Sequence, residues 1–330
     1  MMIKKILAIM PSWIGDMIMA QSLFRLIKAK NPDVIIDVIA PAYSQSLLIR
    51  MPEIRRVIKA PFGHGDFALM ARYRLGTSLR SEAYDQAIIL PNSFKSAFIP
   101  WFANIPLRTG WRGEMRYGLL SDKRVLITSS YPKMVQRYVA LGFKSGELFN
   151  DEIYWPILIP DQALLSAALE KFRLSREKPI LVLCPGAAYG PSKRWPASYF
   201  SQLAEHFLGL GWSVWCIGGP DEKELVSQIQ GIDLTSTSLA EAIDLMSLAT
   251  VVVSNDSGLM HVASALDKPV VAIYGSTMPE HAPPLTHKAR ILSQSLSCKP
   301  CFKRECPFGH YHCLTQISVR RVIDAIGEIA

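Results

Sequence analysis

Residues 251–277 constrain the fold of this chain more than any other stretch, because they read as a strand, a tight polar turn, a helix and a second strand. Both ends of the stretch are apolar and β-branched, as is typical of strands buried on both faces of a parallel sheet. Residues 255–258 stand where the helix begins. The first amides of a helix have no partner inside it and lie at the positive end of its dipole, so this turn predicts a site for the phosphates of a nucleotide diphosphate. The alternative is that Asp256 or Ser257 only caps the helix.

Residues 185–196, PGAAYGPSKRWP, form a second candidate loop, between an apolar strand at residues 180–184 and a helix that begins at about residue 197. Small residues let the loop backbone approach a ligand closely, and open α/β sheets bind ligands at the carboxyl ends of their strands. Lys193 and Arg194 are cations at a helix start, where they oppose the helix dipole, so they indicate an anion nearby. Lys193 is therefore a candidate phosphate clamp, and the alternative is an ordinary solvated charge.

The N-terminus shows the same strand, turn and helix. Residues 3–9 are apolar, PSWIGD follows at residues 11–16, and a helix is expected to run to about residue 30. This turn lacks G-x-G-x-x-G, and the chain contains no lysine-bearing P-loop pattern, which argues against a dinucleotide oxidoreductase and a nucleotide triphosphatase. Asp16 lies at the switch from strand to helix, where it is either a general base facing a cleft or a helix cap.

The two halves of the chain repeat one pattern of alternating strands and helices. Strands are predicted near residues 3–9, 34–40, 56–59 and 86–90, and again near residues 180–184, 213–217, 234, 251–253, 270–274 and 289–292. The pattern predicts an α/β fold of two Rossmann-like, doubly wound parallel sheets that face a central cleft. A proline-containing connector at residues 154–160 and a bridging helix at residues 161–172 indicate domains at residues 1–158 and 159–330.

The positive charge of the chain is concentrated in its first half. Residues 1–158 hold 21 Lys and Arg against 12 Asp and Glu, whereas residues 159–330 hold 15 against 16. The asymmetry predicts an anionic partner for the first half, and nucleic acid is not expected, because no recognised binding motif or interleaved stacking pattern is present. No apolar run approaches the ~20 residues that span a bilayer. We expect a cytoplasmic protein whose basic half makes peripheral, salt-sensitive contact with the inner membrane surface.

The six cysteines fall into two groups. Cys184 and Cys216 lie in predicted strands and are expected to be buried apolar thiols. The other four follow a C-x2-C-x4-C-x6-C pattern and are Cys298, Cys301, Cys306 and Cys313. Four thiolates could hold zinc, but the usual two-plus-two spacing is missing and disulfides are disfavoured in the cytoplasm, so reduced thiols and no metal are expected.

Three segments together resemble the ADP-heptose:lipopolysaccharide heptosyltransferases of glycosyltransferase family 9: PSWIGD, PGAAYGPSKRWP and SNDSGLMHVASALDKPVVAIYGST. PNSFKSAF at residues 91–98 and CKPCFKRECPFGHYHC at residues 298–313 resemble the branch whose acceptor already carries one heptose. The resemblance implies a GT-B fold and inverting transfer of L-glycero-D-manno-heptose from ADP-heptose to the first heptose of heptosyl-Kdo2-lipid A, without a cofactor. It also implies that the last helix, at residues 318–330, packs back on the first domain.

The resemblance also implies roles for individual residues. Asp16 would be the catalytic base, and Lys193 would stabilise the departing diphosphate. The donor-binding residues would be Thr237, with its backbone on adenine, and Asp256, Ser257, Gly258, Leu259 and His261. The acceptor-binding residues would be Asn92, Ser93, Lys95 and Arg116.

Several alternatives remain at this point. His261 could be a half-buried structural histidine, and Asp221 or Glu222 could accept from ribose hydroxyls or simply favour a helix start. A sister enzyme that adds the first heptose, a nucleotide-sugar epimerase and a non-enzymatic polyanion-binding protein are the alternative functions.

Overall fold

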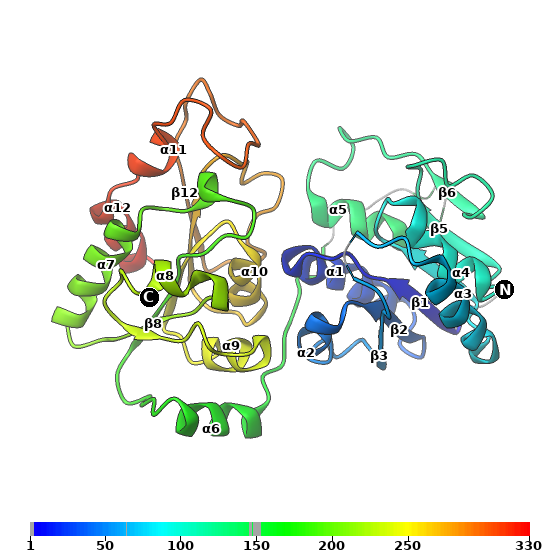
Figure 1. Cartoon of the computed structure of the whole chain (residues 1–330), viewed down its shortest axis with the longest axis horizontal. Coiled ribbons are helices and arrows are strands. Elements are labelled where there is room, and N and C mark those ends of the chain that lie inside the picture. Colours follow the sequence, from blue (N-terminus) through cyan, green and yellow to red (C-terminus); the bar gives the residue numbers. More distant parts are fainter. Residues whose placement is uncertain (1–2, 64, 145–146, 148–152) are drawn as a thin grey trace. The chain divides into compact units, whose positions relative to one another are not determined.

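The computed structural model describes residues 3–63, 65–144, 147 and 153–330. The chain divides into two compact units, Met1–Pro156 and Ile157–Ala330 (Figure 1). The boundary expected from the sequence, after residue 158, lies two residues further along the chain than this one.

The first unit is built on a six-stranded sheet in the order β3-β2-β1-β4-β5-β6, and all its described strand pairs are parallel. Its strands are β1 (Lys5–Ile9), β2 (Ile35–Ala40), β3 (Arg56–Lys59), β4 (Gln86–Ile89), β5 (Leu107–Trp111) and β6 (Asp122–Arg124). Its helices are α1 (Ile14–Lys30), α2 (Gln45–Leu48), α3 (Leu69–Ser78), α4 (Phe98–Phe102) and α5 (Met134–Val139).

Successive side chains along each strand of this sheet point to opposite faces, and helices cover both faces. Leu7 and Ile9 belong to a buried cluster that also contains Ile99 and Ala103, so one face packs against the α3 and α4 region. On the other face, α1 packs against α5 and the turn after it, where a Cβ on Gly142 would lie 2.7 Å from Leu23 Cδ1. Since both faces are covered, β1 is apolar and buried after its first residue, Lys5.

The second unit repeats this plan with the strand order β12-β11-β10-β7-β8-β9, again with parallel described pairs. Its strands are β7 (Ile180–Cys184), β8 (Ser213–Cys216), β9 (Ile232–Asp233), β10 (Val251–Asn255), β11 (Val270–Tyr274) and β12 (Ala289–Ser293). Its helices are α6 (Gln162–Lys171), α7 (Ala197–Gly209), α8 (Lys223–Val226), α9 (Leu239–Met246), α10 (Gly258–Ala265), α11 (His312–Thr315) and α12 (Val319–Gly327).

The last helix, α12, places its apolar face in the core of the second unit. Val322, Ala325 and Ile326 are buried in one cluster with residues of α7 and of the central strands. This cluster explains why the helix is strongly amphipathic in sequence, with Arg320 and Asp324 on its exposed side.

The two sheets confirm the predicted fold class of two doubly wound parallel α/β units. In each sheet the strand order reverses once, between β1 and β4 in the first and between β7 and β10 in the second. Doubly wound sheets bind ligands outside the carboxyl ends of their strands at such a reversal. The loops that follow these four strands are therefore the expected ligand-binding loops of the two sheets.

Candidate functional site

In the second unit, Asn255 at the end of β10 holds the loop that follows β7. Its side chain is fully buried, its Oδ1 accepts from the amide of Trp195 at 3.0 Å, and its Nδ2 donates to the carbonyl of Pro185 at 2.6 Å. Pro185 and Trp195 are near the two ends of the predicted phosphate loop. One amide side chain thus ties residues 185–196 to the turn at residues 255–258.

Lys193 and Asp256 form an ion pair across these two loops. Lys193 Nζ lies 2.6 Å from Asp256 Oδ2, and both side chains are mostly buried. Thr277 Oγ1 also donates to Asp256 Oδ2 at 2.5 Å, and Lys193 Nζ lies 5.0 Å from the centre of the Tyr189 ring. The lysine is therefore fixed at the carboxyl edge of the sheet and is not a freely solvated charge.

The helix α10 begins beside this pair, and no side chain in the described part of the chain caps it. Ser257 occupies the N-cap position with extended backbone, but its side chain makes no capping hydrogen bond. Its hydroxyl lies 3.3 Å from that of Ser254, and the carboxylate of Asp256 is bound to Lys193 and Thr277 instead. The purely structural alternative of a capped helix is therefore wrong. The first-turn amides, including those of Gly258 and Leu259, remain available to an anion.

His261 lies one turn into α10 and is 4% exposed. Burial lowers the pKa of His261 from 6.5 to about 4; Asp256 opposes this shift, and Lys193 adds to it. The imidazole is therefore neutral near pH 7, and it can contribute hydrogen bonds but no positive charge to a phosphate site.

Thr237 and Glu222 lie in loops of the same unit. Thr237 is buried just before α9, where its hydroxyl donates to the carbonyl of Leu234 at 2.6 Å. Next to it, Ser238 caps α9 in a capping box with Glu241. Glu222 accepts from the amide of Gly219 at 2.9 Å and packs so closely on Gly186 that a Cβ there would lie 1.6 Å from its Oε1.

Of the two candidate acids after β8, Glu222 therefore contacts the start of the phosphate loop, whereas Asp221 is exposed. Burial raises the pKa of Glu222, and the hydrogen bond from the Gly219 amide partly opposes that shift. Glu222 is accordingly the better placed of the two to accept hydrogen bonds from a nucleotide lying on this loop.

The cysteine-rich segment supports the other side of the phosphate loop. Ser192 Oγ lies 2.9 Å from Ser276 Oγ and donates to the carbonyl of Lys303, while the Ser192 amide donates to the carbonyl of Arg304 at 3.1 Å. A Cβ on Gly190 would lie 2.6 Å from that same Arg304 carbonyl, so the close approach explains a glycine there.

One cavity of about 20 Å³ is lined by four cysteines of this segment: Cys298, Cys301, Cys306 and Cys313. All six cysteines of the chain are free thiols, and Cys184 and Cys216 are buried in strands as expected. Across the described ranges, no three side chains of His, Cys, Asp or Glu are grouped so that they could hold a metal ion.

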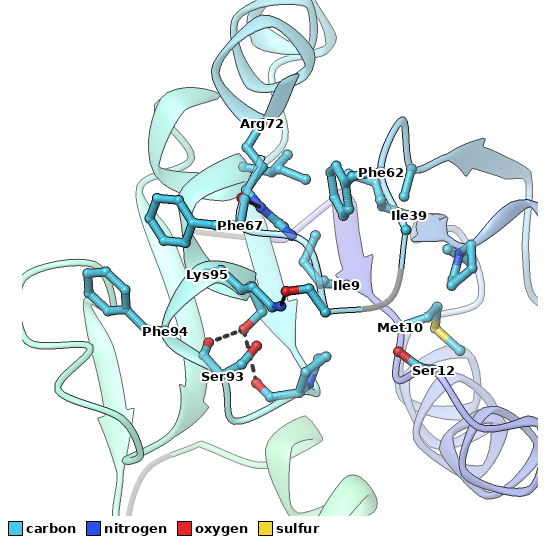
Figure 2. A pocket seen from close by; sticks show the side chains of 18 of the residues that line it. Ile9, Met10, Ser12, Ile39, Phe62, Phe67, Arg72, Ser93, Phe94 and Lys95 are labelled. Carbon is cyan, nitrogen blue, oxygen red and sulfur yellow. Dashed lines mark hydrogen bonds between the residues drawn. The ribbon is translucent and has the colours of Figure 1, made fainter. Parts of the chain in front are cut away.

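The first unit has a cavity of about 580 Å³ at the carboxyl ends of its central strands (Figure 2). Ile9 and Met10 at the end of β1 line it, and so do Ile39 at the end of β2 and Pro91 after β4. Three of the four predicted acceptor-binding residues also line it, namely Asn92, Ser93 and Lys95. This cavity lies at the reversal of strand order.

Arg116, the fourth predicted acceptor-binding residue, is 2% exposed and is absent from the cavity lining. Its guanidinium donates to the carbonyls of Pro91 and Trp111 and to Asn92 Oδ1. Burial lowers the pKa of Arg116 to about 10. Arg116 therefore holds the loop after β4, and because it does not line the cavity it is not placed for a direct contact with an acceptor there.

Asp16 lies in the first turn of α1. Ser12, in the loop just before the helix, lines the cavity, whereas Asp16 itself does not. Tyr138 on α5 donates its hydroxyl to Asp16 Oδ1 at 2.8 Å. Burial, with a further contribution from Asp16, raises the pKa of Tyr138 well above its usual 10, so the phenol keeps its proton and remains a donor. Nothing in the helix-start pattern of residues 11–16 could have predicted this partner.

Two Rossmann-like units, each with its candidate site at the reversal of a parallel sheet, have the architecture of the GT-B fold, which is that of a large class of glycosyltransferases. The sequence profile of Glycosyltransferase family 9 (heptosyltransferase) matches residues 72–312, more than half of the chain. The chain therefore belongs to glycosyltransferase family 9, the heptosyltransferases.

Similar proteins match over nearly the whole length. Lipopolysaccharide heptosyltransferase 2 of Salmonella typhimurium is 44% identical over 342 residues, covering 98% of both chains. The protein of the same name from Escherichia coli is 42% identical over 341 residues, again with 98% of both chains covered. The solved structure of E. coli ADP-heptose LPS heptosyltransferase II is 41% identical, with a TM-score of 0.87 and 98% of both chains covered.

Proposed function

We propose that this protein transfers L-glycero-D-manno-heptose from ADP-heptose to the first heptose of heptosyl-Kdo2-lipid A, with inversion at the anomeric carbon. The observation that carries the donor half is the Lys193–Asp256 pair beside the uncapped start of α10. The close likeness to two lipopolysaccharide heptosyltransferases 2, over 98% of the chain, supports the acceptor and the family branch.

On the donor side, the chemistry needs stabilisation of a leaving diphosphate. Lys193 supplies a positive charge, and the first amides of α10 supply hydrogen-bond donors at the positive end of a helix dipole. Asp256 sets the position of the lysine through its 2.6 Å contact, and Thr277 holds Asp256 in turn. Thr237 would offer its backbone to adenine, and Glu222 would accept from ribose hydroxyls.

On the acceptor side, Asp16 would remove the proton from the attacking hydroxyl, a role worth typically ~10²–10⁴-fold in rate. The acceptor would occupy the 580 Å³ cavity, whose wall includes Ser12 from the loop that leads to Asp16. A single displacement forms the new glycosidic bond as the bond to the diphosphate breaks, so inversion follows without a covalent sugar on the enzyme.

The test is ADP release from ADP-heptose with Kdo2-lipid A and its mono-heptosylated form as separate acceptors. We expect release only with the mono-heptosylated acceptor, and a loss of at least about 100-fold in Asp16→Asn. Asp33→Asn, at an exposed aspartate of the same unit, is the matched control and should keep full activity. Release with Kdo2-lipid A instead would identify the sister enzyme that adds the first heptose.

Two further alternatives predict different results in the same assay. A nucleotide-sugar epimerase would convert the donor without any acceptor. A polyanion-binding protein would release no ADP and would bind its partner equally well after Asp16→Asn and Lys193→Ala.

Peripheral contact of the basic first unit with the cytoplasmic face of the inner membrane belongs to the same proposal. Among the described residues, no helix is both long enough and apolar enough to cross a bilayer. Contact with the membrane surface would bring the cavity to an acceptor that is anchored there by its lipid.

A further inference from the structure

A buried arginine lies in the wall of the first-unit cavity. Arg72 projects from α3, lines the cavity and is 4% exposed. Among the residues that the structure describes, it forms no ion pair with a carboxylate, and the carboxylate of Asp66 acts on it only at longer range. A buried cation without a counter-ion is costly, and because Arg72, unlike Arg116, lines the cavity, an anionic ligand there could supply the missing charge.

The guanidinium of Arg72 is held in a defined plane. Nε donates to the carbonyl of Phe67 at 2.7 Å, and Nη2 donates to the carbonyl of Asp66 at 3.1 Å. Its Cζ also lies 3.7 Å from the centre of the Phe62 ring. Figure 2 shows the side chain reaching from α3 between Phe62 and Phe67 into the space above Lys95. These contacts use Nε and Nη2, and among the described residues none is made by Nη1.

The rest of the cavity wall suits a sugar with a negative charge. Phe62 and Phe67 offer aromatic faces, Asn92 and Ser93 offer polar groups, and Lys95 adds a second cation whose Nζ donates to the carbonyl of Gly65 at 2.5 Å. Glu114 also lines the cavity, but its Oε2 is engaged by the amide of Phe94 at 2.6 Å. The cations therefore outnumber the carboxylates in the wall.

We propose that Arg72 binds a negatively charged group, a phosphate or a carboxylate, of the saccharide acceptor in this cavity. A planar guanidinium already fixed by two carbonyls loses little freedom on pairing, and its remaining donors suit either anion. The inference rests on the proposed function, because it assumes that the cavity holds the acceptor. It makes Arg72 a specificity-determining residue that recognises charge away from the reacting hydroxyl.

The test compares Arg72→Gln with the wild type on three forms of the mono-heptosylated acceptor: intact, treated to remove its phosphates, and with its carboxylates converted to amides. For the intact acceptor, we expect Arg72→Gln to raise KM about 10- to 100-fold, the range of a lost charge-assisted hydrogen bond. The KM for ADP-heptose should not change. On the form that lacks the group Arg72 recognises, variant and wild type should have the same KM, which identifies that group.

The matched control is Arg74→Gln, which removes the same charge from an exposed position on the same helix and should leave all three KM values unchanged. Arg72→Lys keeps the charge but loses the planar fork, so an intermediate KM is expected. It also serves as the test if the melting temperature shows that Arg72→Gln does not fold.

Two results would overturn the inference: an unchanged KM in Arg72→Gln, or the same increase on all three acceptors, which would make Arg72 a support of the wall only. Failure of the proposed function is separable, because equilibrium binding of the de-acylated, phosphorylated oligosaccharide can be measured without donor. If the wild type binds this probe, Arg72→Gln weakens binding and no acceptor yields ADP, then the anion site stands and the proposed reaction is wrong.

Discussion

At the scale of single residues, Tyr138 donates a hydrogen bond to the carboxylate of Asp16, the proposed base. A hydrogen bond donated to a carboxylate favours its ionised form and fixes its rotamer. In Tyr138→Phe we expect kcat to fall about tenfold, a part of what a positioned base supplies, with the KM for ADP-heptose unchanged. We also expect the acid limb of the pH–rate profile to move to higher pH, because the carboxylate then holds its proton more tightly.

Tyr84→Phe is the matched control for this prediction. Tyr84 is also buried and donates its hydroxyl to the carboxylate of Asp37 at 2.5 Å, so loss of that hydroxyl lowers stability in the same way as loss of the Tyr138 hydroxyl. It should leave the pH–rate profile in place. A profile that stays unchanged in Tyr138→Phe as well would reduce the Tyr138 contact to a structural one.

His261 gives a pH dependence of stability with a definite sign. Burial lowers the pKa of His261 to about 4 in the folded chain, whereas an unfolded histidine titrates near 6.5. Between these values the unfolded state binds more protons, so stability falls as the pH drops from about 6.5 towards about 4 and does not depend on this group above 6.5. Urea unfolding at pH 7.5 and 5.0 should show a smaller difference in His261→Gln than in the wild type. His206→Gln, at an exposed histidine, should keep the wild-type difference.

At the scale of elements, Asn255 couples β10 to the loop between β7 and α7. In Asn255→Ala the amide of Trp195 loses its acceptor in a fully buried site, which should cost about 1–3 kcal/mol of unfolding free energy. ADP should also bind more weakly, because the loop that carries Lys193 loses its anchor. Calorimetric titration with ADP and chemical unfolding measure the two effects. Gln230→Ala, at an exposed amide of the same unit, should change neither, and unaltered ADP binding in Asn255→Ala would contradict the anchoring role.

The elements themselves could be predicted from sequence wherever burial on both faces left an apolar run. β7 and β11 are buried along their whole length and occupy the predicted residues, and β1 and β8 differ from prediction only at one end. β3 also occupies the predicted residues, although it is partly exposed and has a charged residue at each end. β5 and β6 were missed, because Leu107–Trp111 includes Arg, Thr and Gly, and Asp122–Arg124 is a short, fully charged strand at the sheet edge. Glycine-rich and polar turns after strands marked the loops that carry the candidate sites.

Contacts between distant segments could not be predicted in this way. Asp16 and Tyr138 are 122 residues apart, and neither the PSWIGD turn nor the sequence around Tyr138 specifies the other. Arg72 and Arg116 look alike in sequence as basic residues of the first half. One lines the cavity and the other lies behind its wall, and only the packing of α3 and of the loop after β5 separates them.

At the scale of the whole molecule, the uneven charge predicts how the chain would meet the lipid-anchored acceptor that we propose. Residues 1–158 have 21 basic and 12 acidic residues, whereas residues 159–330 are nearly balanced with 15 and 16. The first unit also exposes large apolar side chains on α3 and α4, namely Met70, Tyr73 and Trp101. Basic and aromatic groups together suit the interface of an anionic bilayer.

We therefore expect the full chain to sediment with vesicles that contain anionic lipid at low salt and to be released as the salt concentration rises, since each cation near such a surface contributes about 1 kcal/mol and screening removes it. Trp101→Ala should weaken the vesicle binding that remains at intermediate salt, because this variant lacks the indole ring that would insert into the bilayer interface. Leu210→Ala is the matched control, since it removes an exposed apolar side chain from the second unit and should bind as the wild type does. Binding that is equal on neutral and anionic vesicles, or that both variants weaken equally, would mean that the charge of the first unit serves the acceptor alone and not the membrane around it.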